Sequence, residues 1–209
     1  MPRAAPSASP SPGPGADRGS SDASAGPLVQ GLPTTDHSAH STAWRTRQET
    51  PADAAEVHAV TAAAFGRAEE ADLVDALRAD PGAWLPGLSY VAEAPDGTIA
   101  AYALITRCHV DDVPAAALAP VAVRPDLHRL GAGSAVVRAV LEAARARGEG
   151  LVLVLGHPGY YPRFGFGPAS DHGIRAGFDV PSEHLMALVL DGSSPVAPGT
   201  IRYPAAFGV

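Results

Sequence analysis

Apolar side chains recur at regular spacings from about residue 43 onward, and these spacings predict alternating strands and helices. Strict alternation, or a short apolar run between turn residues, is typical of a strand. Apolar residues three and four positions apart are typical of a helix with one buried face. The pattern predicts strands over 44–47, 89–94, 98–107, 116–124 and 151–155, further strand candidates within 184–191 and 200–208, and helices over 51–65, 69–80 and 133–147.

Capping and turn residues support these boundaries. Thr50 precedes Pro51, which suits the first position of a helix, and Gly66 is expected to close that helix. Gly148 is expected to end the third helix in the same way. The sequence Pro-Asp-Gly at 95–97 joins two strand-like segments and predicts a β-hairpin.

Strands that alternate with helices, followed by paired strands near the C-terminus, predict an α/β fold with a mixed sheet. Residues 41–209 are expected to form this domain. Residues 1–40 are rich in Pro, Ser and Ala, with almost no large apolar side chain before Leu28. Such a segment buries too little surface to offset its ordering entropy, so we expect a disordered tail.

Composition narrows the function classes. The chain has 209 residues and a formal net charge of -7, which argues against nucleic acid or an anionic membrane as a general partner. All 15 basic residues are Arg, which excludes Schiff-base chemistry on a lysine. The single Cys108 excludes an internal disulfide and a multi-cysteine metal site. No metal is expected as a cofactor. Because the sequence has no apolar run of membrane length and no signal-peptide core, the chain is expected to be cytoplasmic and soluble.

One segment combines a strand, a basic loop, two glycines and a helix. It runs from Pro120 to Gly148, with Gly131 and Gly133 directly at the expected helix start. A helix N-terminus offers unpaired N–H groups and the positive end of the helix dipole, which together bind anions. The segment is not a dinucleotide-binding fingerprint, because that motif needs a third glycine where Val136 stands. It is not a Walker loop either, because the chain has no Gly-Lys pair.

The same segment resembles motif A of the GNAT superfamily of N-acetyltransferases. The pattern R/Q-x-x-G-x-G/A falls on His128, Arg129, Leu130, Gly131, Ala132 and Gly133, with His128 replacing the usual Arg or Gln. The stretch LVLVLGHPGYYPRFGF is similar to motif B, in which a Tyr, here Tyr161, stands four residues before a Gly-Phe pair. The stretches EEADLVDALR, ALAPVAVRP and RYPAAFG are similar to the YhbS-like subgroup, so the resemblance covers roughly residues 43–209.

This resemblance implies a GNAT-type fold: a mixed, mostly antiparallel sheet with splayed central strands and flanking helices. It also implies acetyl-CoA as co-substrate. The pyrophosphate is expected on the backbone amides of His128, Arg129, Leu130, Gly131, Ala132, Gly133 and Ser134. The pantetheine arm is expected to pair with the backbone of Val121 and Val123 at a free strand edge.

The implied reaction is acetyl transfer to a primary amine by direct attack in a ternary complex. Tyr161 is expected to protonate the departing thiolate. If the segment is helical, Tyr160 lies about 100° away around the helix and is expected to point elsewhere and pack. Sequence spacing does not single out the base that deprotonates the amine. The candidates are His157, taken first, and His109, Asp111, Asp112, Glu69 and Glu70.

Two function classes remain open from the sequence. The first is an active acyltransferase acting on a small-molecule amine or a protein amine. The second is a CoA-binding sensor or partner module with little turnover. Either is compatible with a monomer or a homodimer.

Overall fold

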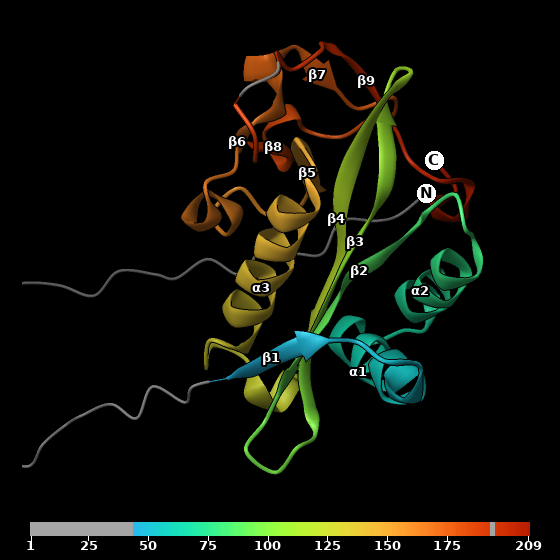
Figure 1. Cartoon of the computed structure of the whole chain (residues 1–209), viewed down its shortest axis with the longest axis vertical. Helices are drawn as coiled ribbons and strands as arrows, with labels where there is room; N and C mark the ends of the chain where they lie inside the picture. The colour runs from blue at the N-terminus through green and yellow to red at the C-terminus, as the bar shows by residue number, and fades with distance from the viewer. Residues whose placement is uncertain (1–43, 193–194) are drawn as a thin grey trace, which may run out of the picture. The chain divides into compact units, whose positions relative to one another are not determined.

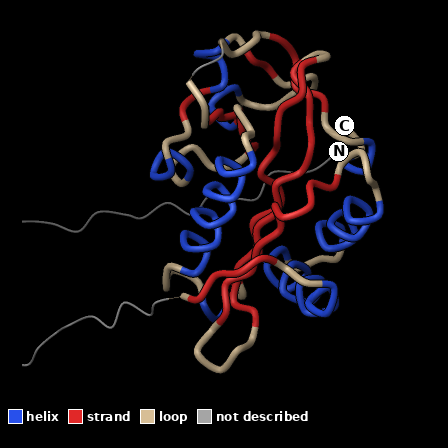
Figure 2. The backbone as a smooth tube through the Cα atoms, viewed as in Figure 1, coloured by secondary structure: helices blue, strands red, loops and turns tan. Residues whose placement is uncertain are grey.

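The computed structural model describes residues 44–192 and 195–209, so the predicted tail over 1–40 lies outside the described residues. The described part contains a nine-stranded sheet in which β1 to β5 lie in chain order and β8 and β6 follow. β9 pairs with β3 and with β7. Figure 2 shows the strands running through the middle of the domain with helices on both sides.

The N-terminal elements follow the predicted pattern. β1 (Arg45–Gln48) is followed by a short 3-10 turn and then by α1 (Ala54–Phe65) and α2 (Glu69–Ala79). Thr50 is the N-cap of the 3-10 turn, and its backbone N–H donates to the Asp53 carboxylate at 2.7 Å. Gly66 ends α1 with φ +70°, a left-handed conformation that glycine adopts readily.

The central strands form an antiparallel meander. β2 (Trp84–Glu93), β3 (Ile99–Val110) and β4 (Val113–Val123) pair in sequence, and Gly97 lies in the predicted hairpin turn. β2 begins five residues earlier than the alternation predicted. The reason is an irregularity in its pairing with β3 between Trp84 and Ser89, which accommodates Pro86 and Gly87 within the strand.

β4 and β5 (Leu151–Leu155) separate after a short stretch of pairing. They pair in parallel only at Ala116 with Val152 and at Ala117 with Leu153. Beyond that point β5 stays with β8 (Leu185–Val189), while β4 continues to Val123 beside β3. The segment 118–123 therefore has a free edge, and the expected splaying of the central strands is confirmed.

The apolar run at 151–155 forms the predicted strand, but its apolar character, which is typical of a fully buried strand, does not match its burial at the C-terminal end. Leu155 is 41% exposed because β4 no longer covers β5 there. The C-terminal region also contains two short strands that the pattern did not predict, β6 (Gly167–Pro168) and β7 (Ile174–Arg175), besides β9 (Gly199–Arg202). Two-residue strands carry too few side chains to show a period.

The helices cover opposite faces of the sheet (Figure 1). α3 (Ala132–Arg147) lies on one face, and α1 and α2 lie together on the other. The buried face of α3 includes five residues at helical spacing: Val136, Val137, Val140, Leu141 and Ala144. Along β4, Val121 and Val123 pack with the α3 side, whereas Ala122 packs with the α1 and α2 side.

Within the described ranges, no helix combines the length and apolar character needed to cross a bilayer.

Candidate active site

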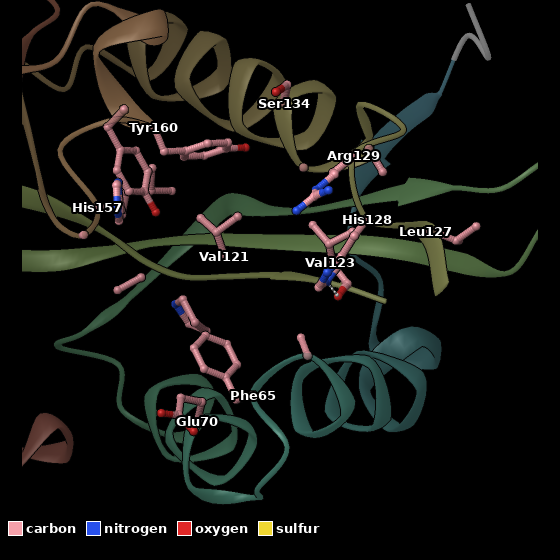
Figure 3. Close-up of a pocket in the computed structure, with 18 of the residues that line it drawn as sticks. Phe65, Glu70, Val121, Val123, Leu127, His128, Arg129, Ser134, His157 and Tyr160 are labelled. Carbon is pink, nitrogen blue, oxygen red and sulfur yellow. Dashed lines mark hydrogen bonds between the residues drawn. The ribbon is translucent and has the colours of Figure 1, made fainter. Parts of the chain in front are cut away.

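A cavity of about 940 Å³ lies where β4 separates from β5. Its walls come from β4, the loop before α3, the end of β5 and, from the other face of the sheet, α1 and α2. Figure 3 shows His157 and Tyr160 at one end, Arg129 and Leu127 at the other, and Phe65 and Glu70 beyond the strand that carries Val121. The sequence-predicted residues that line it are Val121, Val123, His128, Arg129, Gly131, Ala132, Gly133, Ser134, His157, Tyr161 and, among the other candidate bases, Glu70.

The loop before α3 presents backbone N–H groups to this cavity. Gly131 is the N-cap of α3 and has φ +93°, and Arg129 also has a left-handed φ of +64°. No side chain of the described residues caps this helix, so the N–H groups of its first turn are left for another partner. With the positive end of the helix dipole, this arrangement suits an anion.

Position 133 requires glycine because there is no room for a side chain, not because of its backbone conformation. A Cβ added there would lie 2.9 Å from Cγ2 of Val123 and 3.2 Å from the Tyr160 hydroxyl oxygen. Both neighbours line the cavity. The absence of a side chain at Gly133 therefore lets the helix start approach β4 and the tyrosine closely.

The free edge of β4 carries the backbone groups of Val121 and Val123. The Arg124 N–H donates to the Ala100 carbonyl of β3 at 2.9 Å, so the backbone groups of Arg124 face β3. Because backbone groups alternate along a strand, those of Val121 and Val123 face the other way, toward the gap beside β5. This is the arrangement in which an extended amide chain can pair with the strand.

His128 uses its side chain to hold this edge. Its Nε2 lies 3.0 Å from the Val123 carbonyl oxygen. A carbonyl only accepts hydrogen bonds, so Nε2 carries the proton and donates. His128 thus ties the loop to the end of β4, and one of the two lone pairs of the Val123 carbonyl is already in use.

Tyr160 and Tyr161 both line the cavity, which corrects the expectation that Tyr160 points elsewhere. The 3-10 turn begins only at Tyr161 (Tyr161–Phe164), so the two rings do not follow α-helical spacing. The rings are perpendicular, with centroids 5.1 Å apart. Figure 3 shows the Tyr160 hydroxyl directed toward the start of α3.

Tyr161 is the more deeply set of the two. Its ring packs edge-on against Phe166 with centroids 5.8 Å apart, and it fills the space that a side chain at Gly156 would need. Burial raises the pKa of the Tyr161 hydroxyl to about 12, and Tyr160 adds to the shift. The phenol is therefore protonated at neutral pH and available as a donor.

The family model described as the acetyltransferase (GNAT) family matches residues 55–166, from the second residue of α1 to just beyond the 3-10 turn at Tyr161–Phe164. The chain belongs to the GNAT acetyltransferase family. Among curated proteins, it is 39% identical over 137 residues to the uncharacterised N-acetyltransferase YjhQ of Escherichia coli K12, covering 63% of this chain and 75% of YjhQ.

Two solved GNAT structures are similar in fold. The E. coli YhbS protein in complex with CoA superposes with a TM-score of 0.72 at 26% identity, over 79% of this chain and 92% of YhbS. A GNAT acetyltransferase from Brucella melitensis in complex with acetyl-CoA gives 0.65 at 30% identity, over 79% of this chain and 99% of that one. The predicted GNAT fold and the likeness to YhbS are confirmed.

The GNAT cavity also limits the choice of base. Of the six candidates, only His157 and Glu70 line it. The Gly159 N–H donates to Nδ1 of His157 at 3.0 Å, so the neutral ring carries its proton on Nε2. In this neutral form Nε2 of His157 is a hydrogen-bond donor.

Glu70 reaches the cavity from the first turn of α2. Its carboxylate forms a two-point ion pair with Arg67, which does not line the cavity. The neighbouring walls are apolar and include Phe65, which is 41% exposed, and Leu73. The neighbouring Glu69 does not line the cavity.

Asp111 and Asp112 are engaged elsewhere. Asp111 accepts from the Thr200 N–H at 3.1 Å, and Asp112 pairs with Arg202 at 3.3 Å. His109 lies at the end of β3, where it pairs with Arg202 of β9. These three belong to the end of the sheet that β9 covers.

Leu130 is the one predicted motif A residue that does not line the cavity. Its side chain is 57% exposed, and its carbonyl accepts a hydrogen bond of 2.8 Å from the indole of Trp44. Nothing in the sequence pointed to Trp44, because 86 residues separate it from the loop. Within the described residues, no cluster of three or more His, Cys, Asp or Glu side chains could hold a metal ion.

Proposed function

We propose that this cavity binds acetyl-CoA and catalyses transfer of the acetyl group to a primary amine by direct attack in a ternary complex. The observation that carries the proposal is that the uncapped start of α3 and the free edge of β4 open into one cavity. An anion site beside an unpaired strand edge suits a molecule that joins a pyrophosphate to an extended amide chain. The relatives solved with CoA and with acetyl-CoA support this assignment.

The binding residues divide by chemistry. Backbone N–H groups from Arg129 to Ser134 hold the pyrophosphate, with the exposed Arg129 guanidinium adding positive charge. Val121 and Val123 pair through their backbone with the amides of the pantetheine arm. A cavity of this volume is large enough for such a ligand.

When bound, acetyl-CoA supplies an acetyl group activated as a thioester. The Val121 N–H is the donor that we assign to the carbonyl oxygen on which negative charge builds. Tyr161 holds its proton for the departing sulfur. The ordinary pKa of a thiol is about 8.5. Because burial disfavours a charged group, a thiolate released beside Tyr161 is a stronger proton acceptor than a thiolate in water, which favours proton transfer from the phenol.

The acceptor enters from the face of the sheet that α1 and α2 cover. Glu70 and the apolar surface of Phe65 and Leu73 lie there, whereas the phosphate loop lies toward α3. A primary amine is mostly protonated at neutral pH, so a carboxylate attracts it and, through water, takes its proton before attack. We therefore assign the base to Glu70 and a hydrogen-bond donor role at the cavity mouth to His157. The acceptor is a small-molecule amine or an exposed amine of a protein.

The alternative is a module that binds CoA but does not turn it over. Thiol release from acetyl-CoA without any added amine distinguishes the acetyltransferase from the binding module. The acetyltransferase should hydrolyse acetyl-CoA slowly, but faster than the uncatalysed rate, because water reaches the thioester beside Tyr161. Initial rates with an accepted amine should give intersecting double-reciprocal lines, as a ternary complex requires. Saturable CoA binding without thiol release above background, with or without amines, would favour the module. Parallel lines would contradict direct attack.

A further inference from the structure

Trp44 connects the start of the folded domain to the phosphate loop. Its indole Nε1 donates to the Leu130 carbonyl at 2.8 Å, and a Cβ added at Gly131 would lie 3.6 Å from the same nitrogen. Trp44 packs partly buried against the core beneath α3, outside the residues that line the cavity. It also precedes residue 55, where the match to the GNAT family begins.

The hydrogen bond acts on a peptide group that faces the site. The Leu130 carbonyl and the Gly131 N–H belong to one planar peptide unit, in which the two groups point in opposite directions. Fixing the carbonyl toward the indole therefore directs the Gly131 N–H away from Trp44. Gly131 lines the cavity, so this N–H belongs to the set that we assign to the pyrophosphate.

The loop needs such support because part of its backbone is unfavourable. Arg129 holds φ +64°, which costs a residue with a side chain more than it costs glycine. The loop is tied down at two points: the His128 ring bonds the Val123 carbonyl, and the Trp44 indole bonds the Leu130 carbonyl. These two bonds hold it from opposite ends.

We propose that Trp44 is a positioning residue for pyrophosphate binding, and that its indole orients the peptide between Leu130 and Gly131 before the cofactor arrives. This proposal rests on the proposed function. It assigns part of the cofactor affinity to a side chain outside the family's loop motif. Since the indole is in van der Waals reach of the loop, its fluorescence should also respond when the loop is occupied.

The first test is calorimetric titration of Trp44→Phe, which retains a ring but loses the donor. The dissociation constant for CoA should rise by roughly three- to tenfold, the range expected for loss of one hydrogen bond. Titration with pantetheine, which lacks the pyrophosphate, should give the same dissociation constant for parent and variant. Trp84→Phe is the matched control, because Trp84 lies on the other face against Arg78 and should leave both constants unchanged.

The second test uses fluorescence and needs no change at Trp44. In the Trp84→Phe protein, Trp44 is the sole tryptophan, and its emission should change on saturation with CoA but not with pantetheine. The proposal is overturned if Trp44→Phe binds CoA as tightly as the parent does, or if the change weakens pantetheine binding as much as CoA binding. It is also overturned if the Trp44 emission does not change on saturation with CoA. If the parent protein itself does not bind CoA, the proposed function fails instead. Should Trp44→Phe not fold, the fluorescence result alone decides.

Discussion

At the scale of single residues, adjacent positions in this cavity have different surroundings. Both rings contact Phe164, but Tyr161 also packs against Phe166 and the backbone at Gly156. Tyr160 instead carries the Arg163 guanidinium over its ring at 4.5 Å and directs its hydroxyl toward α3. The different positions imply different roles. Tyr161 suits the proton donor, and Tyr160 suits contact with the bound cofactor near the helix start.

Tyr161→Phe tests the first role. The change keeps the ring and its packing but removes the proton, so kcat should fall by roughly 10- to 1000-fold with the dissociation constant for CoA little changed. Tyr160→Phe is the matched control and should weaken CoA binding more than it lowers kcat. If the Tyr161→Phe enzyme keeps the parental kcat, Tyr161 is not the general acid.

The raised pKa of Tyr161 gives this role a pH signature. The donor works only while protonated, so its activity is lost as the pH rises through its pKa. Because burial places that pKa at about 12 rather than about 10, Tyr161 should cause no alkaline fall in kcat near pH 10. Rate measurements up to the limit of protein stability check this, and an alkaline limb near pH 10 that disappears in Tyr161→Phe would contradict it.

Glu70 and Glu69 offer a second matched pair. They are adjacent in the first turn of α2 and both lie within salt-bridge distance of Arg67, but only Glu70 lines the cavity. Glu70→Gln should lower kcat/KM for the amine by roughly 10²-fold or more, the usual contribution of a general base, while CoA binding is unchanged. Glu69→Gln should retain parental kinetics. Equal effects of the two changes would indicate that charge near Arg67, and not a base in the cavity, is responsible.

At the scale of elements, the start and end of α3 share one backbone feature. Gly131 and Gly148 flank the helix with φ +93° and +85°, and a Cβ would meet no steric clash at either. Alanine at either position should therefore destabilise the fold by a similar amount, roughly 1–2 kcal/mol. Only Gly131→Ala should also weaken CoA binding, because Gly148 lies at the far end of the helix. Thermal unfolding and calorimetry on both variants check this, and equal CoA affinity would place the phosphate site elsewhere.

The loop and helix were predictable because their signals are local. Glycines, caps and apolar spacing between Pro120 and Gly148 lie within one stretch of chain, and the structure forms the expected strand, loop and helix there. The resemblance to the family supplied the order of the motifs. The choice between Tyr160 and Tyr161 as cavity residues was only half right, because a 3-10 turn replaced the assumed helix.

Residues that reach the cavity from other elements could not be predicted in this way. Phe65 comes from the opposite face of the sheet and Trp44 meets the loop across 86 residues, and neither was among the predicted site residues. Glu70 was one of six candidate bases, and only the fold places it in the cavity. The orientation of His157 depends on one hydrogen bond from Gly159, two residues away, which no spacing reveals. These features follow from packing rather than from local pattern.

At the scale of the whole molecule, the described residues hold the core and the cavity together, and we propose that residues 41–209 are the catalytic domain. The three buried clusters draw on strands and helices from Val57 to Ile201. Residues 1–38 have few large apolar side chains, so deleting them should leave the thermal midpoint within about 2 °C of the parent. A loss of about 1 kcal/mol in the free energy of unfolding would produce a larger shift. A fall of several degrees would show that the deleted segment stabilises the domain.

The central claim is that this cavity transfers acetyl groups from acetyl-CoA to amines. Its most direct test is thiol release from acetyl-CoA across a panel of primary amines and peptides, with mass spectrometry of each amine for an added acetyl group. We predict at least one amine that accelerates thiol release well above the acceptor-free rate, with one acetylated product formed per thiol and strong loss of both in Tyr161→Phe. Tight CoA binding with no amine acetylated, or acetylation undiminished in Gly133→Val, which should block the helix start, would contradict the account.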